Sequence, residues 1–257
     1  MAAPERLRAD VPLAFGGPVG FYIGDTGDGT SSTTAHEDMD LVRRTLLEFN
    51  DGDVGFLRIY RPGPTAAFSP HDTTLQSYAA AAEAMGALGF DPVERRAGGR
   101  LAVYDGNALV IDLVAPHADP RADVMERFKL FSAAIASALI SLGIDARVGE
   151  IDGEYCPGSY SVNGEGRIKL AGVAQRIARR GYHLGAVIAV ANSDRTKAAV
   201  GDAYRILGFP FAPTSFGAVS DFVPQSSFTS LRHRLRDAVA GELIAVQGPR
   251  AAICLVQ

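Results

Sequence analysis

The chain contains few of the residues that mark secreted or metal-binding proteins. Its 257 residues include two cysteines, five histidines and no tryptophan. Cys156 and Cys254 stand 98 positions apart (254 − 156), which gives no disulfide framework, so a reducing, cytoplasmic setting is expected. No pair or trio of histidine, cysteine and acidic residues has metal-ligand spacing, so no metal centre is predicted.

Long apolar runs and a strong excess of one charge are also missing. No stretch of 18 or more apolar residues occurs, and no apolar segment follows the N-terminal MAAPERLRAD. Neither a membrane-spanning helix nor a secretory signal is therefore expected. The formal net charge of −4 offers no basic excess for nucleic acid. An apolar content of 47% is ordinary for a globular protein with a substantial core.

Hydrophobic spacing and turn residues predict an α+β fold. Helices are expected over residues 33–50, 72–89, 122–142, 193–207 and 227–240. Strands are expected over residues 55–61, 92–97, 100–104, 108–114, 144–148, 168–172 and 187–190. The turns between strands are a Gly98-Gly99 turn and hairpins at Asp105-Gly106-Asn107 and Asn163–Gly166.

Hairpins between strands, in place of regular crossovers, favour a mostly antiparallel mixed sheet flanked by helices. Residues 1–30 are rich in glycine, proline and aspartate and are expected to wrap the surface irregularly. No internal repeat and no linker stand out. Residues 1–257 are therefore predicted to form a single domain.

Cys156 and Lys169 are the first candidates for chemistry. Lys169 lies in an apolar, glycine-punctuated run that is typical of a strand, and a lysine is costly to bury without a task. A reactive thiol needs partial exposure and a nearby positive charge, which Lys169 could supply through the 163–166 hairpin. The simpler alternatives are an inert Cys156 and a solvent-facing Lys169. Cys254, in an apolar stretch, is most simply a small buried hydrophobe.

Three further elements have both a functional and a structural interpretation. The Arg95-Arg96-Ala97-Gly98-Gly99 segment is either a solvated strand edge or a loop of backbone donors for an oxyanion or phosphate. Gly172 suggests close backbone approach to a ligand or to another strand. His183 follows a basic stretch into a strand and is either a site residue or a solvated histidine.

Taken together, these elements resemble the lipoate–protein ligase and octanoyltransferase family, which shares its fold with biotin–protein ligases. The resemblance covers about residues 33–240. Its matching elements are Arg95-Arg96-x-x-Gly99, Asp105-Gly106-Asn107, the helix ending Leu142-Gly143-Ile144, Asn163-Gly164, Ile168–Arg176 and His183.

The resemblance implies a biotin/lipoate protein ligase-like catalytic domain of class II synthetase type. In that family the lysine contacts the acyl carbonyl or the acyl-adenylate, so Lys169 is expected to do so. The substrate-binding residues implied are Arg95, Arg96, Gly98, Gly99, Tyr104, Asp105, Asn107, Gly172, Gln175, Arg176 and His183.

Several departures from the ligase pattern favour acyl transfer without ATP. Arg100 replaces a third glycine of the adenylate loop, and Tyr104-Asp105 stands where ligases have His-Asp. Tyr155-Cys156-Pro157-Gly158 resembles the cysteine-dependent amidotransferase branch of the family. Too few residues follow position 240 for a separate C-terminal accessory domain of the kind many ligases carry.

The resemblance therefore implies an octanoyl/lipoyl amidotransferase with Cys156 and Lys169 as catalytic residues. It would move an octanoyl or lipoyl group from a carrier protein, through a thioester on Cys156, to a lysine of a lipoyl domain. The implied partners are a lipoyl domain, a glycine-cleavage H-type carrier protein or an acyl carrier protein. No tightly bound cofactor, no nucleic acid and no membrane are expected, and we expect a monomer.

Two other functions stay open. The first is an ATP-dependent lipoate–protein ligase that works through an acyl-adenylate and has an incidental Cys156. The second is a non-catalytic homologue that binds acyl groups or carrier proteins, for which Arg100 and Tyr104 are the reasons.

Overall fold

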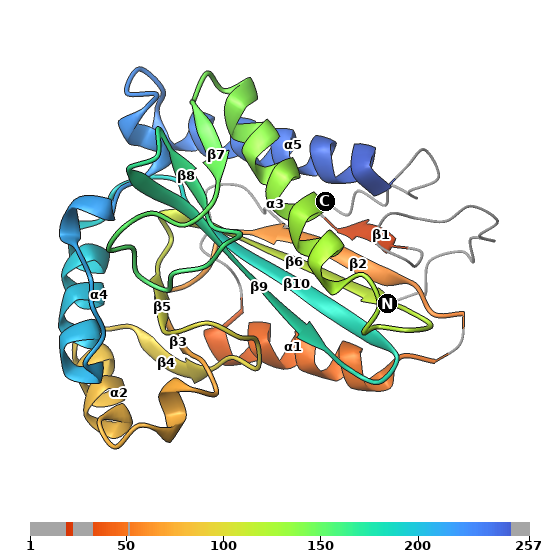
Figure 1. Ribbon diagram of the computed structural model, residues 1–257, viewed down its shortest axis with the longest axis horizontal. Coiled ribbons are helices and arrows are strands. Elements are labelled where there is room, and N and C mark those ends of the chain that lie inside the picture. The colour runs from red at the N-terminus through yellow and green to blue at the C-terminus, as the bar shows by residue number, and fades with distance from the viewer. Residues whose placement is uncertain (1–18, 23–32, 51, 248–257) are drawn as a thin grey trace.

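The computed structural model describes residues 19–22, 33–50 and 52–247, which fold into two β-sheets covered by helices (Figure 1). The strands of the larger sheet follow the order β1-β2-β6-β10-β9-β8-β7. They span β1 (Val19–Tyr22), β2 (Gly55–Tyr60), β6 (Ala108–Pro116), β7 (Ala146–Val148), β8 (Val162–Gly164), β9 (Ile168–Ile177) and β10 (Gly181–Ala189). The smaller sheet has the order β4-β3-β5, with β3 (Thr65–Phe68), β4 (Asp91–Glu94) and β5 (Ala102–Tyr104).

The helices cover both sheets. The α-helices described are α1 (Ala35–Glu48), α2 (Tyr78–Ala87), α3 (Val124–Ser141), α4 (Asp194–Leu207) and α5 (Phe228–Gln247). Short 3-10 helices span Asp72–Thr74, Pro213–Ser215 and Val219–Asp221. Helices α3 and α5 lie together on one face of the larger sheet, whereas α2 and α4 lie beside the smaller sheet (Figure 1).

The alternation of side chains along β6 and β10 explains where the site lies. Leu109, Ile111 and Leu113 of β6 belong to the main core beneath α3 and α5. Val110 and Asp112, which point to the opposite face of the sheet, line a cavity. On β10 the same alternation places His183 at the cavity. One face of the central strands therefore builds the core, and the other face forms a wall of the cavity.

Several local predictions are confirmed. Thr34 caps α1 through a capping box, in which the Glu37 N–H donates to Thr34 Oγ1 at 3.2 Å and the Thr34 N–H donates to Glu37 Oε2 at 2.7 Å. Strands β8 and β9 form the predicted hairpin, with left-handed backbone at Glu165 (φ 56°) and Gly166 (φ 71°). Two successive positive φ values match the right-handed twist of the flanking strands.

The predicted Asp105-Gly106-Asn107 hairpin is wrong, because β5 belongs to the smaller sheet and β6 to the larger one. Asp105 Oδ2 instead accepts hydrogen bonds from Ser193 Oγ (3.0 Å) and Thr196 Oγ1 (2.9 Å) at the start of α4. These bonds hold the connection against α4. The Gly98-Gly99 turn joins no strand pair either, because β3 lies between β4 and β5.

Two further expectations need correction. The helix predicted over residues 72–89 is divided into the 3-10 helix Asp72–Thr74 and α2, which starts only at Tyr78. The irregular path predicted for residues 1–30 is wrong at Val19–Tyr22, which form β1 and pair with β2 in parallel. The mixed, mostly antiparallel larger sheet is as expected, and the separate smaller sheet was not foreseen.

Some expectations fall outside the described residues, among them the rest of the 1–30 segment apart from β1, and the burial of Cys254. That residues 1–257 form one domain stays a prediction. Across residues 19–22, 33–50 and 52–247, no helix is both long and apolar enough to cross a membrane. The same ranges hold no cluster of three or more potential metal ligands among histidine, cysteine, aspartate and glutamate.

Candidate active site

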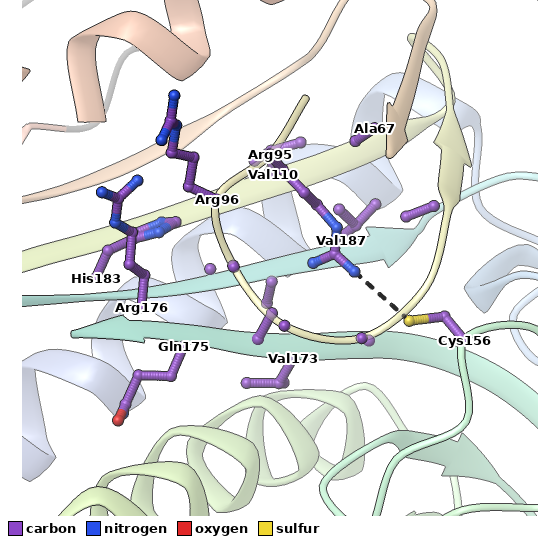
Figure 2. A pocket seen from close by; sticks show the side chains of 18 of the residues that line it. Ala67, Arg95, Arg96, Val110, Cys156, Val173, Gln175, Arg176, His183 and Val187 are labelled. Carbon is purple, nitrogen blue, oxygen red and sulfur yellow. Dashed lines mark hydrogen bonds between the residues drawn. The ribbon is translucent and has the colours of Figure 1, made fainter. Parts of the chain in front are cut away.

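A cavity of about 720 Å³ lies on the face of β9 and β10 that is opposite the core, and the loop that follows β4 covers it (Figure 2). Valines from β4, β6, β9 and β10 line its middle: Val93, Val110, Val173 and Val187. Cys156 and Arg95 meet at one end, and the polar side chains of Arg96, Arg176 and His183 gather at the other. The cavity is thus apolar in its middle and polar at both ends.

Cys156 sits in a left-handed turn, with a φ of 44° that is rare for a residue other than glycine. Its N–H donates to the Tyr204 hydroxyl at 2.6 Å, and that hydroxyl donates to the Leu101 carbonyl at 2.9 Å. Such a backbone conformation persists only where surrounding contacts hold it, and residues in it often lie at active sites. The turn presents the sulfur to the cavity.

Lys169 binds the backbone of this turn through hydrogen bonds. Its side chain is buried, with 1% of the residue exposed. Nζ donates to the carbonyl oxygens of Tyr155 (2.8 Å) and Cys156 (2.7 Å) and to Glu154 Oε1 (3.2 Å). Burial lowers the pKa of Lys169, while the charges of Cys156 and of the Glu154 carboxylate oppose that shift. The hydrogen-bond partners of this ammonium are the Glu154 carboxylate and two backbone oxygens, and Cys156 influences its pKa through charge.

Glu154 organises the same loop and was not anticipated from the sequence. Its Oε1 accepts hydrogen bonds from Ser161 Oγ (2.7 Å) and from the Gly158 N–H (3.1 Å) as well as from Lys169. The residue is 2% exposed, so its charge is compensated almost entirely by these donors. A carboxylate in a turn-rich stretch gives no sequence signal for such burial.

The sulfur itself is contacted by the loop that follows β4. Cys156 Sγ lies 3.2 Å from the Arg100 N–H and 3.7 Å from an Arg95 guanidinium nitrogen. Gly99 has a φ of 95°, and a Cβ on it would lie 2.9 Å from this sulfur. Glycine at this position is therefore required both by the backbone conformation and by the approach of the thiol.

The opposite end of the cavity carries positive charge. Arg176 of β9 pairs in register with His183 of β10, and Arg96, from the loop, lies at the same end of the cavity (Figure 2). Burial lowers the pKa of Arg176, and the charges of Arg96 and Arg43 lower it further. Gln175 also lines the cavity, and its Oε1 lies 3.4 Å from a nitrogen of the buried Arg127.

A buried ionic chain stands behind His183, and its other members were missed in the sequence. His183 Nε2 lies 2.9 Å from Asp112 Oδ1, and Asp112 Oδ2 accepts from Arg58 at 2.9 Å. Arg58 donates in turn to Asp38 of α1 at 2.8 Å. Burial opposes ionisation of Asp112, but its bonds to His183 and Arg58 prevail and hold its pKa below the ordinary value.

Eleven of the thirteen residues predicted for the site line this cavity: Arg95, Arg96, Gly98, Gly99, Tyr104, Cys156, Lys169, Gly172, Gln175, Arg176 and His183. Asp105 and Asn107 do not line it. The Asp105 carboxylate binds the start of α4, and the Asn107 carbonyl accepts from the backbone N–H groups of Val190 and Ala191. These two residues therefore fix the connection between the sheets, outside the lining of the cavity.

The arrangement suits nucleophilic attack on a carbonyl group that is attached to an apolar chain. The Cys156 thiol has an N–H donor and a guanidinium beside it, and cysteine is a strong nucleophile towards carbonyl groups. The valine-lined middle gives an apolar chain a place to bind. Tyr104 contributes a neutral phenol at this wall, because burial raises its pKa.

Comparison with known proteins identifies relatives with acyl-transfer names. An octanoyl-GcvH:protein N-octanoyltransferase of Geobacillus kaustophilus is 33% identical over 136 residues, covering 53% of this chain and 47% of that protein. A lipoyl-GcvH:protein N-lipoyltransferase of Listeria monocytogenes is 28% identical over 174 residues, covering 60% and 62%. The matched region thus spans about half to three fifths of the length of these relatives.

Solved structures show the same fold. A bi-partite lipoate protein ligase of Thermoplasma acidophilum superposes with a TM-score of 0.63 at 19% identity, covering 95% of this chain and 88% of that one. A lipoate-protein ligase A bound with ATP gives 0.63 at 20% identity, covering 89% and 85%. The expected lipoate-ligase-like α+β fold is thereby confirmed. The family model described as the lipoyl protein ligase A/B catalytic domain matches residues 35–208, and the chain belongs to that family.

Proposed function

We propose that the protein is an amidotransferase that moves an octanoyl or lipoyl group from a carrier-protein lysine to a lysine of a lipoyl domain. The observation that carries this proposal is the placement of Cys156 Sγ at one end of an apolar cavity, within 3.2 Å of the Arg100 N–H. The names of the two relatives, which specify octanoyl-GcvH and lipoyl-GcvH as donors, support a carrier of that kind.

The first step forms a thioester. The Cys156 thiol loses its proton, and the sulfur electron pair forms a bond to the acyl carbonyl carbon, so that an oxyanion develops. The tetrahedral species collapses with cleavage of the carbon–nitrogen bond. The donor lysine leaves as an amine and takes up the proton that the thiol released.

The second step reverses the first with a different amine. The lysine amine of the acceptor domain attacks the thioester carbonyl, the carbon–sulfur bond breaks, and the thiol is regenerated. One amide is consumed and one amide is formed, so the exchange needs no ATP. An acyl carrier protein is a further donor within this proposal; its acyl thioester would exchange with the Cys156 thiol, and the carrier's own thiol would leave in place of an amine. We place the reaction in the cytoplasm with a monomeric enzyme.

An ATP-dependent ligase is the alternative from the same family. Arg100 argues against it, because this arginine replaces a glycine of the adenylate loop and its guanidinium lies 4.3 Å from the Phe209 ring centre. The contacts of Cys156 also argue against an incidental cysteine, since a residue kept only for packing has no need of a left-handed turn. A non-catalytic binder would likewise have no use for a sulfur held by two donors.

A transfer assay tests the proposal. Octanoylated carrier protein is mixed with an unmodified lipoyl domain and the enzyme, with and without ATP, and octanoyl on the lipoyl domain is measured by mass spectrometry. We expect transfer in the absence of ATP that is lost in Cys156→Ala. ATP-dependent transfer from free octanoate that survives Cys156→Ala would indicate the ligase, and saturable binding without any covalent product would indicate the binder.

A further inference from the structure

We propose that the free edge of β9, over residues 173–177, is the docking site for an extended segment of the protein substrate. The segment would add to the larger sheet as a β-strand and present its lysine to Cys156. The inference rests on the proposed function, because it assumes that the substrate lysine belongs to a folded carrier or lipoyl domain. It assigns the recognition of that domain to backbone groups, which no sequence pattern indicates.

Strand β9 has a partner on both sides over only part of its length. Its pairing with β10 covers residues 171–177, whereas its pairing with β8 covers residues 168–171. Burial follows this division, because residues 169–171 are buried and residues 172–177 are half-buried or exposed. Beyond Ala171, no strand in the described part of the chain continues the sheet on the side away from β10.

The turn between β9 and β10 shows which backbone groups of this edge are free. The Ala178 N–H donates to the Gly181 carbonyl at 2.9 Å, so these two residues form a hydrogen-bonded pair. In an antiparallel pair such residues alternate with residues whose backbone groups point away from the partner strand. The N–H and C=O groups of Val173, Gln175 and Ile177 therefore point away from β10. None of them has a hydrogen bond on that side to a described residue.

Space lies beside this edge and continues to the nucleophile. The side chains of Val173 and Gln175 lie on the side of β9 opposite Arg176, and both residues line the cavity (Figure 2). Phe128 of α3 and Tyr160 line the same cavity, and their rings stack with centres 5.0 Å apart. An incoming segment therefore has an aromatic pair to pack on as well as a strand to pair with.

Gln175 offers a further donor. Its Oε1 accepts from Arg127 at 3.4 Å, which leaves Nε2 to donate. Nε2 is buried and has no hydrogen-bond partner among the described residues. A buried amide donor without a partner destabilises a protein, and a backbone carbonyl of an added strand is an acceptor that would satisfy it.

The position of the edge suits a lysine substrate. Lys169 Nζ binds the Cys156 carbonyl at 2.7 Å, and Lys169 Cε lies 3.5 Å from where a Cβ on Gly172 would be. Gly172 directly precedes the free segment, so the edge begins beside the nucleophile. Neighbouring strands lie about 4.8 Å apart, and an extended lysine side chain is longer than that spacing. A lysine of the added strand can therefore reach Cys156, while its acyl group enters the valine-lined part of the cavity.

The edge of β9 lacks the features that usually keep a sheet edge from pairing. Exposed edges are commonly short or carry proline or lysine. Residues 173–177 include neither proline nor lysine, and their one charged side chain, Arg176, lies at the cavity beside His183 (Figure 2). By contrast β7, the last strand at this end of the larger sheet, has only three residues and carries Arg147.

Residue-resolved hydrogen exchange of the wild-type enzyme tests the proposal, with and without an unmodified lipoyl domain. No acyl donor is present, so no transfer takes place. In the free enzyme, the amides of Val173, Gln175 and Ile177 should exchange fast, and those of Ala174 and Arg176, which bond to β10, slowly. An excess of lipoyl domain should slow the first three amides by about tenfold or more and leave the exchange of β7 unchanged.

A proline variant tests one of these hydrogen bonds by affinity. Ile177→Pro removes an N–H that points away from β10, so the pairing of β9 with β10 is kept. Binding of the lipoyl domain, measured by calorimetry, should weaken about three- to tenfold, since one backbone hydrogen bond is lost. Ile177→Ala is the matched control, because it removes the side chain but keeps the N–H. It should bind the lipoyl domain more tightly than Ile177→Pro by a similar factor.

Slow exchange of the three outward amides in the free enzyme would overturn the proposal, because another part of the chain would then cover the edge. Exchange that an excess of lipoyl domain leaves unchanged, or equal affinities of the two variants, would overturn it as well. The wild-type exchange decides the matter if Ile177→Pro does not fold. Transfer through Cys156 with an unprotected edge would refute only this inference, whereas a protected edge without transfer would refute only the proposed function.

Discussion

Lys169 Nζ donates a hydrogen bond to the Cys156 carbonyl oxygen at 2.7 Å and another to the Tyr155 carbonyl oxygen at 2.8 Å. A buried cation thus fixes the left-handed conformation of the nucleophile, with the carboxylate of Glu154 as its counterion. The lysine of this site therefore determines where the sulfur lies.

Lys169→Met should destabilise the fold strongly. The substitution leaves the carboxylate of Glu154 buried without its cation, and breaking a buried pair in this way costs about 3–5 kcal/mol. Urea unfolding measures the loss. Lys129→Met, at a lysine whose side chain is 62% exposed, should change the free energy of unfolding by no more than about 0.5 kcal/mol. Equal stabilities of the two variants would contradict the structural role of Lys169.

Gly99→Ala should displace the sulfur. The new Cβ would lie 2.9 Å from Cys156 Sγ and 2.8 Å from an Arg95 nitrogen, on a backbone with a φ of 95°. We expect a loss of about 1–2 kcal/mol from the backbone conformation and a marked fall in acyl transfer. Gly98→Ala is the matched control, since its Cβ would meet nothing within 4 Å. Similar effects of the two changes on transfer would show that sulfur placement is not limiting.

Tyr204→Phe should loosen the turn. It removes the hydroxyl that accepts from the Cys156 N–H and donates to the Leu101 carbonyl. Two groups lose their partner, at a cost of about 1–3 kcal/mol in the free energy of unfolding. Tyr160→Phe serves as control, because its ring stacks on Phe128 and its hydroxyl has no hydrogen bond to any described residue. Urea unfolding of both variants measures how much the Tyr204 hydroxyl contributes to the free energy of unfolding.

Asp112→Asn should change how stability depends on pH. The pKa of Asp112 is lower in the folded chain than its ordinary 3.8, because His183 and Arg58 outweigh the effect of burial. Its contribution is therefore complete above pH 3.8 and is lost as the pH falls through the folded value. The stability difference between wild type and variant should be about 3–5 kcal/mol at pH 7 and shrink towards pH 3.

Urea unfolding across this range provides the measurement. Asp202→Asn, at a side chain that is 53% exposed, should show a small difference at every pH. A difference for Asp112→Asn that stays constant down to pH 3 would contradict the lowered pKa.

The sequence could reveal those parts of the site that lie close together in the chain. Lys169, Gly172, Gln175 and Arg176 share one strand, and Cys156 lies one hairpin away from them, so their grouping followed from local patterns. The groups that the Lys169 ammonium contacts could not be predicted from the sequence, because they depend on how the 151–161 loop folds around Glu154.

Long-range ionic partners could not be found in the same way. Asp112 and Arg58 are separated by 54 positions, and each alone is an ordinary charged residue in a strand. The Asp105-Gly106-Asn107 turn was wrongly predicted to be a hairpin for a related reason. Its residues have the composition of a hairpin, but Ser193 and Thr196 bind Asp105 and direct the chain from one sheet to the other.

The most direct test of the account is the covalent state of Cys156. The enzyme is incubated with octanoylated carrier protein in the absence of ATP and of any acceptor, quenched in acid and digested. Mass spectrometry should find an octanoyl group on the peptide that contains Cys156, released by hydroxylamine as a thioester and missing in Cys156→Ala. An enzyme that transfers octanoyl groups but never carries one on Cys156 would contradict the thioester mechanism.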